Sequence, residues 1–132
     1  MQLYNNKVEL VQGLKRCAAL HTVNLANNRV VSMRGLEEEL PRAVRWLSLA
    51  SNRLVAMEGL AHLTGLVHVD LSYNELTSVT GLSTLTGLEE LKLKCVGAPR
   101  VGTVMLYCTP AALIISLSTA LVCIVLFVPR PV

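Results

Sequence analysis

Three residues of the types that form a hydrolytic relay, His68, Asp70 and Ser72, stand two residues apart in one short segment, and Asp70 is the only aspartate. If this segment is a β-strand, alternation places the three side chains on one face, where they project in parallel. A serine nucleophile needs its histidine base within hydrogen-bond reach, and parallel projection holds the two apart. We therefore predict a polar binding surface here and no enzymatic activity.

The sequence does not support other kinds of chemistry either. No glycine-rich phosphate loop occurs, and the four cysteines, at positions 17, 95, 108 and 123, show no paired metal-ligand spacing. The net charge of +3 is spread along the chain, and only 4% of the residues are aromatic. We expect no metal, no cofactor, no small-molecule substrate and no nucleic-acid partner.

The candidate residues belong to a repeating unit, which is clearest from Leu66 to Leu88. The first part of this unit alternates, with Val69 and Leu71 inward, as a strand buried on one face requires. The second part spaces Leu and Val three apart, as in tight helical turns. Apolar residues of the unit occupy positions 66, 69, 71, 76, 79, 82, 85 and 88. One unit cannot bury its apolar edge, but a stack of units can.

Asparagine marks the repeat, because Asn6, Asn28, Asn52 and Asn74 lie 22, 24 and 22 residues apart. A Gly-Leu pair follows each of them, at positions 13–14, 35–36, 59–60 and 81–82. Glycine at one point of every unit indicates a backbone conformation or a close approach that a side chain would obstruct. The asparagines are polar residues in an apolar stripe, so we predict a buried ladder in which they hydrogen-bond to the backbone of adjacent coils.

The pattern over residues 1–95 resembles the 22-residue class of leucine-rich repeat proteins, which includes the protein phosphatase 1 regulatory subunit and the axonemal dynein light chain. The resemblance implies an α/β solenoid of about four units, each with a short parallel strand in a concave sheet and helical or 3₁₀ turns on the convex side. It also implies a non-enzymatic module that binds another protein through the concave face.

The strand register identifies the residues that this concave face would display. They are Tyr4, Asn24, Trp46, Ser48, His68, Asp70, Ser72, Glu90 and Lys92. Trp46 is the only tryptophan, and an aromatic residue framed by small polar residues is typical of an anchor for a partner. The alternative is that Trp46 packs over the neighbouring strands without a partner.

Three departures from the repeat affect the organisation of the chain. Met1 stands where the first strand leucine belongs, so we expect the first coil to fray or be covered. The second unit has two extra residues within positions 37–43, which we expect to form a convex loop with Glu37, Glu38 and Glu39 on a solvated helix face. Val96 replaces the next asparagine, so the solenoid is predicted to end at 95 and a linker to follow over 96–109.

The segment 110–128 carries no charged residue and is followed by a short tail, 129–132. As a helix it would span about 28 Å, close to the thickness of the bilayer core. We predict a C-terminal transmembrane helix that tethers a cytoplasmic solenoid to a lipid bilayer. One alternative is an apolar flap that covers the last coil near Leu91 and Leu93. Another is a soluble cytoplasmic scaffold or regulatory fragment, phosphatase-regulatory or axonemal in type, with an aberrant apolar terminus.

Overall fold

The computed structural model describes residues 1–76, 78–79, 84–96, 115–116 and 122–127, and the statements below concern these residues. Their elements are, in chain order, β1 (Thr22–Asn24), α1 (Leu36–Glu39), β2 (Trp46–Ser48), β3 (His68–Asp70), β4 (Ser78–Val79), β5 (Glu90–Val96), β6 (Ile115–Ser116) and β7 (Val122–Phe127).

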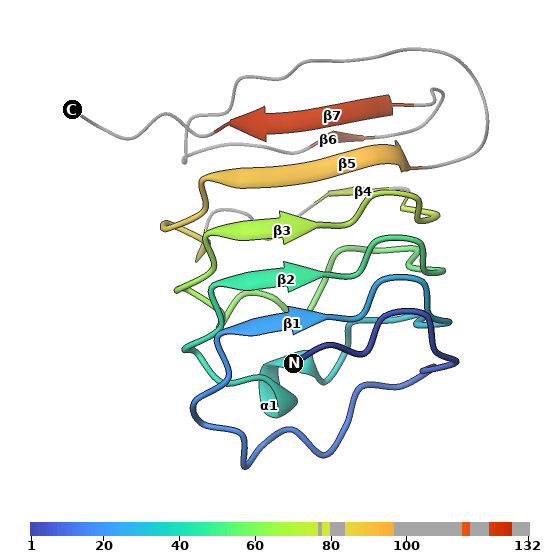
Figure 1. Ribbon diagram of the computed structural model, residues 1–132. Helices are drawn as coiled ribbons and strands as arrows, with labels where there is room; N and C mark the ends of the chain where they lie inside the picture. The colour runs from blue at the N-terminus through green and yellow to red at the C-terminus, as the bar shows by residue number, and fades with distance from the viewer. Residues whose placement is uncertain (77, 80–83, 97–114, 117–121, 128–132) are drawn as a thin grey trace.

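The strands β1, β2, β3 and β5 form a parallel sheet, one strand from each successive coil (Figure 1). Val23, Leu47, Val69 and Leu91 lie opposite one another in register. Gln2 adds a parallel bridge to Asn24, so the first coil joins the same edge. Parallel strands in sequence order, each returned by a loop on one side, are the layout of a leucine-rich-repeat-like solenoid.

The core lies between the sheet and the convex loops. The inward strand residues Val23, Leu25, Leu47, Leu49, Val69, Leu71, Leu91 and Leu93 are all buried. They pack with apolar residues from the convex side, among them Met33, Leu54 and Leu63. Leu3, in the first coil, is only partly buried because one side of that coil is open. The alternation of apolar residues along each strand therefore positions the core as the sequence predicts.

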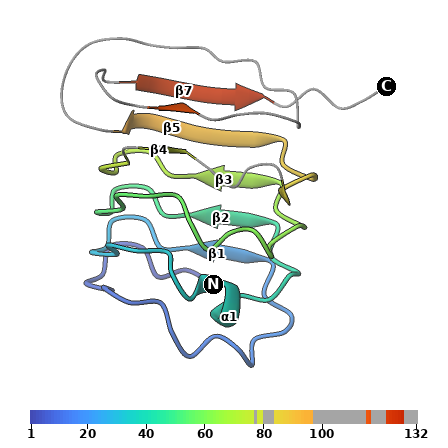
Figure 2. The ribbon, with the colours of Figure 1, turned by 180° about the vertical axis from the view of Figure 1, so that it is seen from behind.

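The convex side turns by hydrogen bonds that span three residues, which explains the three-residue leucine spacing. In the third unit, the amide of Leu63 donates to Leu60 and that of Leu66 donates to Leu63, both at 2.9 Å. The second unit, which has the extra residues, forms the four-residue helix α1 at this place (Figure 2). Glu37 and Glu38 are exposed there, and Lys15 Nζ of the neighbouring coil lies 3.1 Å from Glu38 Oε2.

The asparagines link each coil to the one before it. Asn52 Nδ2 donates to the carbonyls of Leu49 and Ala50 in its own coil and to Leu25 in the preceding coil, at 2.9, 3.2 and 2.9 Å. Its Oδ1 accepts the Val30 amide at 2.9 Å. Asn28 and Asn74 repeat this pattern, and all three residues are at most 8% exposed. Asn6 is exposed and bonds within its own coil.

The segment predicted as a transmembrane helix, 110–128, is described only at β6 and β7, and both are strands. β7 pairs antiparallel with β5, and Leu126 and Ile124 lie opposite Leu91 and Leu93. At these described residues the structure therefore has strands in place of the predicted helix. β-branched residues such as Val122 and Ile124 favour strands, and the free edge of β5 supplies backbone partners that a helix would not use.

The position of β7 beside Leu91 and Leu93 agrees with the alternative of an apolar segment at the last coil. β6 forms a separate antiparallel pair with β4, in which Ile115 lies opposite Val79. Of the predicted linker 96–109 only Val96 is described, as the last residue of β5, and the tail 129–132 lies outside the described residues. Within the described part of the chain, no helix is both long and apolar enough to cross a membrane.

Candidate functional site: the concave face

The outward residues of the parallel sheet are arranged in columns, because the strands pair without a shift. The first column contains Thr22, Trp46, His68 and Glu90. The second contains Asn24, Ser48, Asp70 and Lys92. Backbone bonds from Asn27 to Ala50 and from Ser51 to Ser72 carry the same register past the ends of the strands. The sheet therefore brings eight of the nine sequence-predicted residues onto one surface, and Tyr4 lies exposed on the adjoining first coil.

Trp46 occupies the middle of this surface, between Thr22 on one strand and His68 on the other. It is half-buried, whereas the sequence pattern predicts an exposed position. Its burial therefore lies between that of a core residue and that of a freely exposed anchor.

The charges at one end of the surface are held together by Glu90. His68 Nδ1 lies 3.3 Å from Glu90 Oε2, and Lys92 Nζ lies 3.4 Å from Glu90 Oε1. The carboxylate is the least exposed of the three side chains, at 25%. His68 Nδ1 is therefore directed toward Glu90 on the next strand.

Asp70 is the second acidic group of this face, and Lys92, which lies opposite it in the strand register, forms its ion pair with Glu90. Its Oδ1 accepts the backbone amide of Ser72 at 3.0 Å, as Asn24 Oδ1 does for Ala26 at 3.1 Å. Among the described residues no Lys, Arg or His nitrogen forms an ion pair with Asp70. A half-buried carboxylate in this state favours a cationic group from outside the chain.

A hollow of ≈ 420 Å³ lies beside Asp70, where the strands end. It is lined by Ala26, Asn27, Ala50, Ser51, Asp70, Ser72, Tyr73 and Lys92. Asn27, Ser51 and Tyr73 have φ of 54°, 55° and 57°, and this left-handed backbone turns the chain out of the sheet. Small residues at the strand ends leave the space open.

Ser48 and Ser72 were predicted to be displayed, but each is only 4% exposed. Ser48 lies between Asn24 and Asp70 on the adjacent strands, and both serines offer a partner little accessible surface. Asn27, Ser51 and Tyr73 were missed by the sequence analysis, although each directly precedes a ladder asparagine. That fixed position is the signal that could have identified them.

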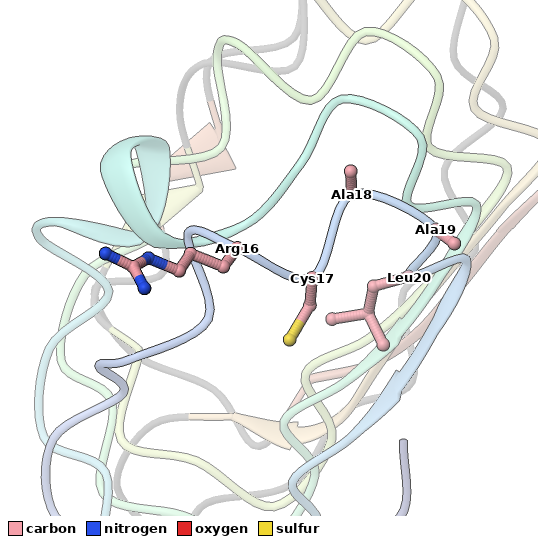
Figure 3. Close-up of a pocket in the computed structure, with 5 residues that line it drawn as sticks. All are labelled: Arg16, Cys17, Ala18, Ala19 and Leu20. Carbon is pink, nitrogen blue, oxygen red and sulfur yellow. The ribbon is translucent and has the colours of Figure 1, made fainter.

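A second hollow, of ≈ 480 Å³, is formed by Arg16, Cys17, Ala18, Ala19 and Leu20 in the convex turn of the first coil. Figure 3 shows the Arg16 guanidinium directed away from Cys17 and Leu20. Cys17 has the same backbone hydrogen-bond pattern as Leu63 and Leu85 in later coils. Those two leucines are buried, whereas Cys17 is exposed. This hollow is therefore an uncovered turn of the repeat. Among the described residues there is no group of three His, Cys, Asp or Glu side chains that could hold a metal.

Comparison with solved structures supports the architecture. The chain is similar to the functional domain of InlJ from Listeria monocytogenes, a leucine-rich repeat protein, with a TM-score of 0.56 and 22% sequence identity. The match covers 80% of this chain and 19% of that chain, so this chain spans about a fifth of its length. No protein-family model matches, and no curated protein matches. The described part of the chain has a leucine-rich-repeat-like solenoid fold.

Proposed function

We propose that this chain is a non-enzymatic protein-interaction module that holds a partner protein against its concave face. The observation that carries the proposal is the unpaired Asp70 carboxylate beside a hollow on the same sheet surface as the half-buried Trp46. Tryptophan is enriched among the residues that anchor interfaces, and a carboxylate can form charge-assisted hydrogen bonds with a basic group of the partner. The strands fix both side chains, so little ordering is needed on binding.

The chemistry of the face indicates what the partner presents to it. A basic side chain suits Asp70, and an apolar or aromatic group suits the exposed part of Trp46. The repeat pattern resembles phosphatase-regulatory and axonemal proteins, so a purified phosphatase catalytic subunit is the first partner to test. The proposal does not include a membrane tether, because the described residues of 110–128 are strands.

Site-specific photo-crosslinking tests which face binds. A photoreactive phenylalanine analogue is placed in the full chain at Thr22 or Lys92 on the concave face, or at Glu38 or Ala61 on the convex side, all at least partly exposed. We expect the same crosslinked protein from both concave positions and not from the convex ones. Adducts formed from the convex positions alone would contradict the proposal.

Asp70→Asn tests the charge without disturbing the fold. The amide keeps an oxygen that can accept the Ser72 amide, so the melting temperature should change little. Affinity for the crosslinked partner should fall about tenfold, which corresponds to about 1.4 kcal/mol for a charge-assisted contact. Calorimetric titration of the purified pair measures the effect, with Glu38→Gln as the control because Glu38 is exposed on α1, on the convex side. Equal affinity of the two variants would exclude Asp70 from the site.

A further inference from the structure

A second surface lies along the loops that follow the strands, on the side toward which the arrows of β1, β2 and β3 point (Figure 1). In each loop one apolar residue points into the core: Val8 is partly buried, and Val30, Leu54 and Leu76 are fully buried. Successive loops are joined at this point by 2.9 Å bonds from the amides of Arg29, Arg53 and Glu75 to the preceding coil. Equivalent residues of neighbouring coils therefore stack at about the strand spacing of ~4.8 Å.

The residue before each of these inward positions points outward, and together the four form a charged column. The charged column consists of Lys7, Arg29, Arg53 and Glu75, and all four are exposed. Within the described residues, none of the three cations forms an ion pair, whereas Lys15, Arg34 and Lys92 each do. The column thus presents three uncompensated positive charges in a line, followed by one negative charge.

In the first three coils the residue after the inward position, Glu9, Val31 or Val55, is also exposed, and it is apolar in the second and third coils. Val31 is 56% exposed and Val55 is 49% exposed. These two residues are the apolar column. Leu10 and Tyr73, which lie on the same loops, are also large hydrophobic residues and more than half exposed. Exposed apolar residues gathered beside unpaired charges indicate an interaction surface.

The spacing of the columns distinguishes among the chain conformations that could bind along them. Residues three and four apart on a helix have side chains ~5–6 Å apart, close to the spacing of the coils. Alternate residues of an extended strand are about 6.6 Å apart, so over three coils their side chains would no longer lie opposite the residues of successive coils. We propose that this surface binds an amphipathic helix of another protein, with acidic residues on one stripe facing Lys7, Arg29 and Arg53. A neighbouring apolar stripe of that helix packs on Val31 and Val55.

The charge order also sets the direction of the helix. Glu75 ends the column, so the acidic stripe of the partner should be followed by a basic residue at that end. An anionic lipid surface is a poorer match, because Glu9 and Glu75 interrupt the basic surface and three cations are fewer than lipid-binding basic clusters use.

A synthetic helical peptide provides the probe. It carries glutamate on one stripe and leucine on the next, and its affinity for the full chain is measured by fluorescence anisotropy. We expect binding that weakens at high salt and that falls about fivefold in the Arg29→Gln, Arg53→Gln double variant. The matched control, Arg16→Gln with Arg42→Gln, removes the same charge from exposed residues elsewhere and should change affinity by less than about twofold.

Charge exchange makes the test specific. The Arg29→Glu, Arg53→Glu variant should bind a peptide with lysine in place of glutamate better than it binds the original peptide. Equal binding of the original peptide by the wild-type protein and both double glutamine variants would overturn the proposal. Binding of phosphatidylserine vesicles without binding of the peptide would also overturn it, in favour of a membrane surface. Asp70→Asn should leave peptide binding unchanged, so this test and that of the concave face can fail separately.

Discussion

Replacing Asn52 with alanine is expected to destabilise the protein by about 2–3 kcal/mol. The side chain donates to the carbonyls of Leu25 and Leu49 and accepts the amide of Val30, all at 2.9 Å in the buried interior. Alanine removes these bonds and leaves the buried Val30 amide without its partner, whereas the carbonyls of Leu25 and Leu49 still accept from Asn28 and Asn74. A buried amide left without a partner costs about 1–3 kcal/mol, and the lost bonds between the coils add to this. Urea unfolding monitored by Trp46 fluorescence measures the loss.

Asn6→Ala is the matched control for this variant. Asn6 occupies the same position of the repeat, but it is exposed and its Nδ2 bonds only to the carbonyls of Leu3 and Tyr4 in its own coil. Water can take over these bonds, so we expect a loss below about 1 kcal/mol. Similar losses for Asn6→Ala and Asn52→Ala would show that the amide contributes through local turn geometry and not by linking coils.

Gly59→Ala is expected to cost about 2–4 kcal/mol, because two unfavourable terms coincide. Gly59 has φ of 75°, a left-handed conformation that an alanine adopts only with strain. A Cβ at this position would also collide with the carbonyl oxygen of Met33 in the preceding coil. That oxygen belongs to the backbone, so the coils themselves must separate to make room. Thermal unfolding of the purified variant tests this expectation.

Gly35→Ala separates the two terms. Gly35 stands at the same place in the second unit with φ of 84°, but a Cβ there would meet nothing within 4 Å. Only the conformational strain remains, so we expect a loss of about 1 kcal/mol. If both substitutions cost the same, the contact between coils at Gly59 contributes nothing to stability.

Much of the solenoid was predictable because its constraints repeat. The spacing of Asn28, Asn52 and Asn74 fixes the length of a coil, and each coil contacts mainly its neighbours, so a local pattern determines the stacking. The glycines that recur after them indicate a special backbone, and Gly13, Gly35 and Gly59 all have positive φ. Several independent signals in each unit agree, so the register of the strands follows from the sequence.

The segment after residue 96 was not predictable in the same way. A continuous apolar run such as 122–127 has no periodicity that distinguishes a membrane helix from a buried strand. What selects the strand is the unpaired edge of β5, which belongs to another part of the chain. The exposed fractions of Trp46, Ser48 and Ser72 could not be predicted from the sequence either. Alternation predicts on which face of the sheet a side chain lies, but not how far the neighbouring side chains cover it.

The pairing of β7 with β5 also bears on aggregation. Val122–Phe127 is an uncharged run of residues with high β-propensity, and Glu90–Val96 is the longest strand of the described sheet. Either one, with its backbone unpaired, is a template for strands from other molecules. Antiparallel pairing joins one edge of each strand, so a single intramolecular contact covers the edge of β5 at which intermolecular fibril growth could begin.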